Sequence, residues 1–422
     1  MRYEPLNVGR WVLWGATALV FIVAPFVFRG GFALTLMTQM GIMIIFALSY
    51  NMLLGQGGML SFGHAVYSGL GAYIAVHALN LAGKGAFPLP VALLPLVGGL
   101  AGLFFGVIFG YVTTKKAGVT FAMITLGLLE LVFACVLMFP GFFGGEGGIT
   151  TNRTAAPAPF GVNFGAPLQV YFLVAVWCFA SMAAMFALTQ TPLGRMANAV
   201  RDNPERAEFV GYNTQYVRFI QLMLSAFFAG VSGALSCVNF EIVSAENVSA
   251  VRSGGVLLAA FIGGFPFFFG PIIGAIVFVF FAAALSGFTK AWLLYLGLFF
   301  VGMVLYAPGG IASLVLMQFP VLRIGRFREL AWPYTGAGAA ALVAIAGLVG
   351  IVEMVYRLSD TSLSSQMTLF GIDFDAKNTL PWIGFAVTLA AGIGLLRMAW
   401  RAVSARWNAI QHDLLARQKA AA

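Results

Sequence analysis

Charged residues are scarce in this chain. Asp, Glu, Lys and Arg make up 9% of its 422 residues and hydrophobic residues make up 61%, whereas soluble domains carry about 25% charged residues. Cysteine is also rare: Cys135, Cys178 and Cys237 all lie in apolar runs without metal-ligand spacing. They are expected to be small buried hydrophobic residues, and no metal site is predicted. The composition places the chain in a lipid bilayer.

A phosphate-binding loop is missing as well. No G-x-x-x-x-G-K-[ST] motif occurs, and Lys84, which follows Gly83, precedes another glycine. That motif is the one whose backbone amides and lysine hold nucleotide phosphates. The chain is therefore not expected to be an enzyme by itself, and no cofactor is expected in it.

Long apolar runs are what the sequence does contain. They are continuous rather than alternating, which favours helices over a barrel, and about 20 apolar residues suffice for one crossing. The first run lacks a clear cleavage site and is expected to be retained. The fold class is therefore an all-α polytopic membrane protein. The candidate crossings are residues 11–28, 32–54, 59–82, 88–113, 118–140, 168–189, 216–240, 253–269, 271–289, 291–307, 332–354 and 381–400.

The basic residues predict the orientation. Twelve crossings with both termini in the cytoplasm put 16 of the 23 Lys and Arg residues on the inner side, in agreement with the positive-inside rule. The net charge of +9 is then explained by orientation and by anionic lipid, and nucleic acid is not an expected partner. The other seven Lys and Arg residues are predicted on the outer side: Arg29, Lys84, Arg153, Arg252, Lys290, Arg357 and Lys377.

One crossing is short and interrupted. Residues 253–269 contain Gly263, Gly264 and Pro266, so a re-entrant loop is the alternative. A re-entrant loop would move the basic stretch 323–328 to the outer side, against the positive-inside rule. A crossing is therefore predicted here, with a break that is tolerated where the backbone faces protein or a water-filled cavity.

Two parts are predicted along the chain. Residues 1–318 form a glycine-rich, ten-span body, in which small residues at helical spacing allow close helix packing. Residues 319–422 add a two-span extension with a polar outer loop and a basic, amphipathic end suited to the inner membrane surface.

The longest charge-dense segment is TPLGRMANAVRDNPERAEFVG, residues 191–211. Thr191 followed by Pro192 predicts a helix start, and Asn203 followed by Pro204 predicts a second one. Gly211 is a natural helix stop. Two short helices under the membrane are predicted, with Met196 and Val200 forming an apolar knob. An ordinary solvated loop is the alternative to a docking surface.

Several motifs resemble the M-type membrane subunit of branched-chain amino-acid ABC importers. They occur in the family's order over about 310 residues. Their sequences are FALSYNMLLGQGGMLSFGHAVYSGLGAY (46–73), KKAGVTFAMITLGLLEL (115–131), GGEGGIT (144–150), the segment that begins at Thr191, LLAAFIGGFPFFFGPIIGA (257–275) and YAPGGI (306–311). The resemblance stops near residue 318.

This resemblance implies a permease in the bacterial inner membrane that works within a heteromeric complex. The expected partners are an H-type permease subunit, two cytoplasmic ATPase subunits that carry ATP and Mg, and a periplasmic substrate-binding protein, in addition to membrane lipid. The segment 191–211 resembles the family's coupling segment. The residues expected to couple to the ATPase are Gly194, Arg195, Met196, Val200, Arg201, Glu205 and Arg206.

Polar residues within the apolar runs are candidates for the translocation path or a gate. One set surrounds the Gly55–Gly58 break, and the other lies in the fifth run, where Glu130 is expected to be buried. Capping of helix ends and hydrogen bonding inside the bundle are the alternatives, and a structural role is preferred for the histidine. These candidates are Asn51, Gln56, Ser61, His64, Thr125 and Glu130.

The acidic glycine-rich loop is a candidate receptor contact or outer gate, with a plain flexible turn as the alternative. It comprises Gly144, Gly145, Glu146, Gly147 and Gly148. Other function classes remain open. An ATPase-independent secondary transporter or channel would have no need of the 191–211 segment, and the motifs favour the amino-acid branch over a sugar permease. Related permeases for urea, amides or small carboxylates are not separated by the sequence.

Overall fold

A computed structural model describes residues 8–86, 88–157, 163–359 and 365–421. Among them, nine helices are long and apolar enough to cross a membrane, or up to ten if one bent helix pair is a single span. The predicted all-α polytopic class is confirmed. The chain divides into two compact units, Met1–Phe288 with Leu296–Ser313, and Thr289–Tyr295 with Leu314–Ala422. The boundary predicted at residue 318 stays a prediction.

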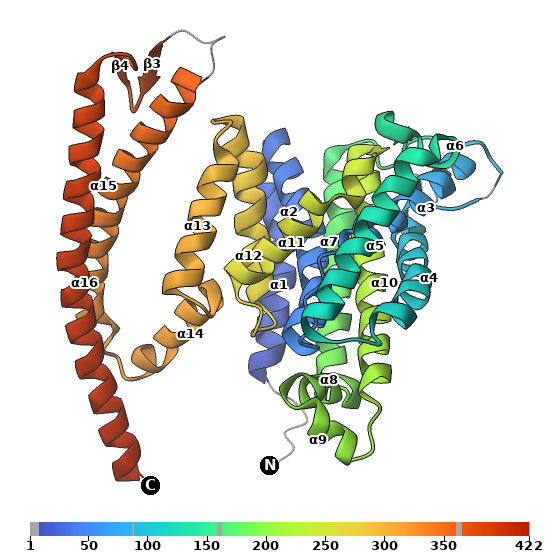
Figure 1. Cartoon of the computed structure of the whole chain (residues 1–422), viewed down its shortest axis with the longest axis horizontal. Helices are drawn as coiled ribbons and strands as arrows, with labels where there is room; N and C mark the ends of the chain where they lie inside the picture. Colours follow the sequence, from blue (N-terminus) through green and yellow to red (C-terminus); the bar gives the residue numbers. More distant parts are fainter. Residues whose placement is uncertain (1–7, 87, 158–162, 360–364, 422) are drawn as a thin grey trace. The chain divides into compact units, whose positions relative to one another are not determined.

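The first unit is a helical bundle (Figure 1). Its helices are α1 (Val8–Val27), α2 (Gly31–Asn51), α3 (Ala65–Gly83), α4 (Leu94–Thr113), α5 (Gly118–Met138), α6 (Pro140–Phe143), α7 (Pro167–Gln190), α8 (Pro192–Asp202), α9 (Pro204–Phe209), α10 (Thr214–Phe240), α11 (Ala250–Gly263), α12 (Gly270–Val279) and most of α13 (Trp292–Tyr306), with the start of α14 (Gly310–Arg323). Short turns are η1 (Met52–Gln56), η2 (Val91–Leu93), η3 (Gly145–Gly147), η5 (Ala245–Val248), η6 (Phe280–Ala284) and η7 (Leu285–Gly287).

Glycine packing holds the centre of this bundle, where α10 lies against α3 and α4. A Cβ atom at Gly230 would collide with the carbonyl oxygen of Gly98, and one at Gly233 would collide with that of Ser68. The helix backbones therefore touch, as the small-residue runs predict.

Replacement of Gly230 by alanine is expected to lower the melting temperature of the detergent-purified protein. The methyl group has only backbone to displace, and overpacking of this kind costs about 1–3 kcal/mol. Gly15→Ala is the matched control because no atom lies within 4 Å of a Cβ at Gly15. Equal melting temperatures for the two variants would contradict the close packing.

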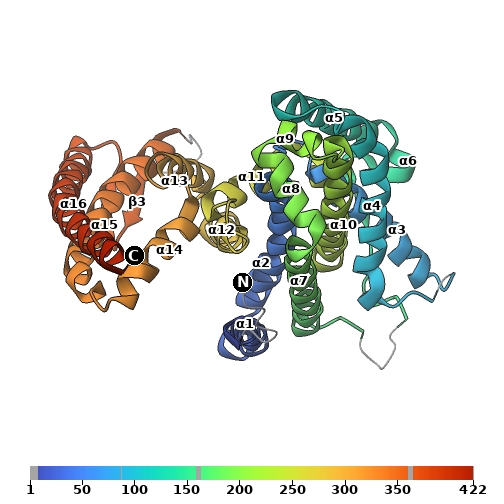
Figure 2. The same cartoon turned by 90° about the horizontal axis from the view of Figure 1, so that it is seen from below.

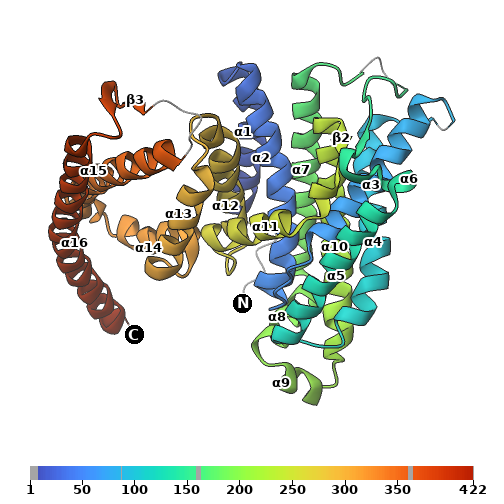
Figure 3. The same cartoon turned by 45° about the horizontal axis from the view of Figure 1, so that its top comes forward.

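The segment predicted as the crossing 253–269 is different in the structure. Its helix, α11, has 14 residues and ends at Gly263, which gives a length of about 21 Å against the roughly 30 Å of a bilayer core. Gly264 then turns the chain with φ +106°. The predicted break therefore lies at Gly263–Gly264, and whether this short helix with its break crosses the membrane stays a prediction. Figure 3 shows how short α11 is beside α2 and α10.

This shortening reopens the topology. If α11 does not cross, every later loop lies on the opposite side of the membrane from the predicted one, unless a second segment also fails to cross. The pair α13 and α14 is bent by 46° and is either one broken span or a re-entrant loop. A re-entrant pair would restore the predicted inner position of residues 323–328. The orientation of both termini stays a prediction.

The second unit is built on two long helices, α15 (Phe327–Ser359) and α16 (Thr379–Ala421), which are packed along each other. Gly347 and Gly392 allow the close approach, since a Cβ at either would meet backbone of the other helix. Figure 2 shows the two helices side by side. Glu353 of α15 also accepts a hydrogen bond from the hydroxyl of Tyr295 at 2.9 Å.

A short hairpin connects these helices. Its strands, β3 (Gln366–Leu369) and β4 (Ile372–Asp375), pair antiparallel. After the second strand, the backbone amide of Lys377 donates to the carboxylate of Asp375 at 2.9 Å. This hydrogen bond favours the charged form and lowers the pKa of Asp375 below its usual value.

Candidate functional site

Two helices project from one end of the first unit, between the C-terminal end of α7 and the start of α10 (Figure 1). They are α8 and α9, the two short helices that the sequence predicts within residues 191–211. The hydroxyl of Thr191 accepts the amide of Gly194 at 3.4 Å, and Asn203 accepts that of Arg206 at 2.9 Å. Gly211 has φ +93°. Both predicted caps and the predicted stop are confirmed, and we call α8 and α9 the projecting helices.

The apolar side chains of the projecting helices that are buried and those that are exposed differ from the predicted ones. Val200 is buried against Ala197, Ala207 and Val217, with Met196 half-buried beside them. Met196 and Val200 do share the predicted apolar face, but Val200 is not available for docking, because this face fixes α8 to the start of α10. The helix pattern shows that one face is apolar, but it does not show which neighbour that face meets.

Phe209 is the exposed apolar group instead. Its side chain is 92% exposed at the end of α9, and Val210 next to it is 71% exposed. A groove of about 350 Å³ runs beside them, lined by Met196, Ala199, Asp202, Asn203, Arg206, Ala207, Val210 and Tyr212. Arg195 and Glu205 are also exposed, whereas Gly194 is buried. An exposed aromatic beside a groove of mixed polarity is typical of a protein-binding surface.

Arg201 joins the projecting helices to the body of the unit. Its guanidinium donates to the carbonyl oxygen of Gly55 and to the carboxylate of Asp202, the latter at 2.9 Å. Gly55 lies in η1, a π-helical turn that ends α2. Gly58 follows with φ +63°, and a Cβ there would approach Cγ of Arg201 to 2.7 Å. The arginine therefore contacts both sides of the predicted glycine break.

The predicted path residues around this break are gathered in one buried cluster. Asn51, Gln56, Ser61, His64 and Thr125 are all buried. The hydroxyl of Thr125 accepts the amide of Phe62 at 3.1 Å, and that of Ser61 accepts the amide of Gly63 at 3.3 Å. These bonds hold the non-helical stretch before α3. Sequence spacing predicts the neighbourhood of the break, but not the approach of α5 through Thr125.

His64 has no exposed surface. Its Nε2 atom lies 2.9 Å from the hydroxyl of Ser49, and the rings of Phe46, Tyr50 and Tyr67 surround it at 5.4, 5.4 and 6.0 Å between centroids. This surrounding favours the structural role. Gln221 ties Gln56 to α10 by donating to its side-chain oxygen at 3.3 Å. Asn51 has a buried oxygen that finds no partner among the described residues.

Glu130 lies outside the cluster. It is exposed on the outer face of α5, beside Gly127 and Leu131. The expectation that this carboxylate is buried is wrong, because α5 covers the cluster through Phe121, Thr125 and Leu129 and leaves the opposite face open. Its role in a path stays a prediction.

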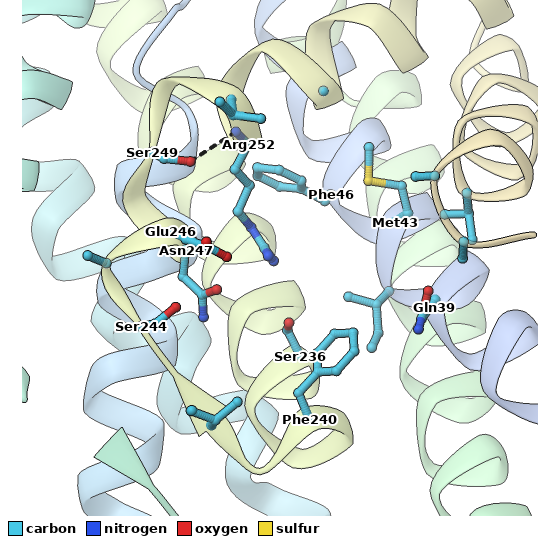
Figure 4. Close-up of a pocket in the computed structure, with 18 of the residues that line it drawn as sticks. Gln39, Met43, Phe46, Ser236, Phe240, Ser244, Glu246, Asn247, Ser249 and Arg252 are labelled. Atoms are coloured by element: carbon cyan, nitrogen blue, oxygen red, sulfur yellow. Dashed lines mark hydrogen bonds between the residues drawn. The ribbon is translucent and has the colours of Figure 1, made fainter. Parts of the chain in front are cut away.

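A partly open cavity of about 930 Å³ lies elsewhere in the unit, among α2, α5, α10, α11 and α12 (Figure 4). None of the six predicted path residues lines it. Glu146 and Gly147 of the glycine-rich loop do, together with Glu246 and Asn247 of η5 and Arg252 of α11. The loop and η5 are connected by an antiparallel pair, β1 (Ile149–Thr150) with β2 (Ile242–Val243).

The glycine-rich loop is shaped by its glycines. Gly144, Gly145 and Gly148 all have positive φ values, of 76°, 61° and 68°. A Cβ at Gly148 would also collide with the carbonyl oxygen of Val243. These glycines give the loop the backbone shape in which Glu146 and Gly147 line the cavity.

Sequence reasoning missed Glu246, Asn247 and Arg252. The available signal was an arginine at the start of a short, glycine-interrupted apolar run, directly after an acidic loop. Its charge alone indicates only a position on the outer side. The cavity joins segments more than 200 residues apart, and no spacing in the sequence reveals it.

A family model described as branched-chain amino acid transport system, permease component, matches residues 32–308. The chain belongs to this family. The high-affinity branched-chain amino acid transport system permease protein LivM of Escherichia coli strain K12 is 28% identical over 324 residues, which are 71% of this chain and 74% of LivM. LivM of Salmonella typhimurium strain LT2 is 26% identical over 327 residues, with 72% and 75% covered. No solved structure matches.

The family match contains the break, the projecting helices and the cavity. It ends before α14, so most of the second unit lies outside it. This family is a transport permease component. The chain is therefore a multi-pass membrane protein of a transport system.

Proposed function

We propose that this chain is the transmembrane permease subunit of an ATP-driven, binding-protein-dependent importer for branched-chain or related amino acids. It forms half of the translocation path and couples to a cytoplasmic ATPase through residues 191–211. Membership in the permease family supports the transport function. The names of the LivM relatives supply the substrate class.

The contact of Arg201 with Gly55 is the observation that carries the coupling. It connects an exposed helix pair to the place where α2 stops. A π-helical turn followed by glycines is a point where a helix changes direction readily. A push on the projecting helices is therefore passed to α2 by a charged hydrogen bond. An ATPase-independent channel would have no use for this connection.

The proposed partners of the chain are those that the family resemblance implies. Two ATPase subunits carry ATP and Mg, and one of them seats on the groove beside Phe209. An H-type permease subunit completes the path, and a periplasmic binding protein delivers the substrate near Gly144–Gly148. The protein lies in a bacterial inner membrane with both termini in the cytoplasm. Urea, amides or small carboxylates are the alternative substrates.

Affinity purification of the tagged chain from its native membranes tests the assembly. We expect a second permease and two ATPase subunits to be recovered in constant ratio and identified by mass spectrometry. Recovery of a monodisperse lone chain that transports leucine without ATP would contradict the proposal.

A further inference from the structure

We propose that Arg252 and Glu246 bind the two charges of a zwitterionic amino acid inside the 930 Å³ cavity, while the aromatic wall of the cavity receives its apolar side chain. This inference rests on the proposed function, because it names the substrate class for a transporter of small molecules. The cavity has the size of ordinary small-molecule sites, which hold about 300–1,000 Å³.

Arg252 has no ionic partner among the residues that the structure describes. Its side chain extends from the first turn of α11 into the cavity (Figure 4). It forms no ion pair in the part of the chain that the structure describes, and its buried Nε atom has no hydrogen-bond partner there. The guanidinium carbon lies 5.7 Å from the centroid of the Phe46 ring. A cation that is half-buried and has no ionic partner is costly, so binding of an anion beside it is favoured.

A carboxylate is the anion that fits this group best. The planar guanidinium presents parallel N–H donors that match the two carboxylate oxygens. The helix start adds to the attraction. The amide of Arg252 donates to the hydroxyl of Ser249 at 3.3 Å, which caps α11, and the N-terminal end of a helix attracts negative charge.

Acidic groups share the same cavity. Glu246 comes from η5 and Glu146 from η3, and both line it. Neither forms an ion pair with Arg252 among the described contacts, so the positive and negative charges do not cancel each other within the protein. A ligand that carries both charges can satisfy both groups, with its carboxylate on Arg252 and its ammonium on Glu246.

The rest of the wall is apolar. The space is lined by Met43 and Phe46 from α2, by Phe133 from α5 and by Phe278 from α12. Gly255 makes room for the last of these, because a Cβ there would approach the Phe278 ring to 2.8 Å. Such a wall suits an aliphatic side chain. Urea carries no charge and no such side chain, and a small carboxylate carries no ammonium, so the cavity favours a branched-chain amino acid.

The test measures leucine uptake by the assembled complex in proteoliposomes, with the binding protein present at a saturating concentration. Arg252→Gln is expected to lower ATP-driven leucine uptake at least about tenfold, since the charged, forked hydrogen bonds to the substrate carboxylate are lost. Hydrolysis stimulated by the binding protein should persist. Arg29→Gln is the matched control, because among the described residues this exposed arginine bonds to the carbonyl of Phe26 at the end of α1 and does not line the cavity. Its uptake should equal that of the wild type.

Chemical restoration of the charge separates ligand binding from a structural role. In a Cys135→Ser background, where the remaining two cysteines are fully buried, Arg252→Cys should lose uptake. An aminoethyl methanethiosulfonate reagent should restore part of it, and the sulfonatoethyl reagent should not. Wild-type uptake by Arg252→Gln, or equal uptake after the two reagents, would overturn the inference. A wild-type complex without ATP-dependent leucine uptake would instead overturn the proposed function.

Discussion

Replacement of Phe209 by aspartate is expected to abolish ATP-driven uptake while the chain still inserts and folds. The ring is 92% exposed, so its removal costs the isolated chain little. In the proposed complex it is an aromatic anchor beside the groove, and loss of such an anchor weakens binding by about 2 kcal/mol or more, roughly 30-fold. Phe209→Leu retains an apolar group and should keep most of the activity.

Co-purification of the ATPase subunits measures this effect directly. Phe209→Asp should lose them, and Phe209→Leu should retain them, at equal amounts of inserted permease. Full recovery of ATPase with the aspartate variant would show that the partner docks elsewhere, for example on the exposed residues of α5.

Arg201→Glu should have a different result: the complex assembles, but hydrolysis no longer drives uptake. The new carboxylate faces the carbonyl oxygen of Gly55 and the carboxylate of Asp202, which are the two groups that now accept hydrogen bonds from Arg201. Repulsion replaces two charged hydrogen bonds. A decrease in uptake of at least about tenfold is expected, since each such bond contributes about 1.5–3 kcal/mol.

Uptake per hydrolysed ATP is the quantity to measure. Arg201→Lys keeps the charge but loses the forked geometry, so an intermediate value is expected. Lys116→Glu reverses an exposed charge between α4 and α5 and serves as the control. A normal ratio in Arg201→Glu would show that the contact with Gly55 does not transmit the movement.

The sequence predicted the helical elements well where they depend on local chemistry. The apolar runs became helices, and the caps at Thr191 and Asn203 formed as predicted, because a capping side chain bonds within its own turn. Helix length was less predictable. The run from residue 253 continues through Phe265–Phe269, but the helix ends at Gly263 because Gly264 turns the chain with φ +106°, and glycines there allow α12 and α14 to approach closely.

Side-chain placement was predictable only as a pattern. The amphipathic pattern indicates that Val200 lies on the apolar face of its helix. The apolar run around Glu130 indicates only that a charged residue is rare at such a position. Which face meets the body of the protein depends on packing between distant helices. For this reason Val200 is buried, Glu130 is exposed and Arg252 lines the cavity.

The energy source of transport tests the central claim most directly. The purified complex is reconstituted with its binding protein, and entry of radiolabelled leucine is followed with ATP, with a non-hydrolysable ATP analogue, or with an imposed ion gradient alone. We predict uptake with ATP only. Uptake driven by the ion gradient in the absence of ATP would contradict the account and would favour a secondary transporter.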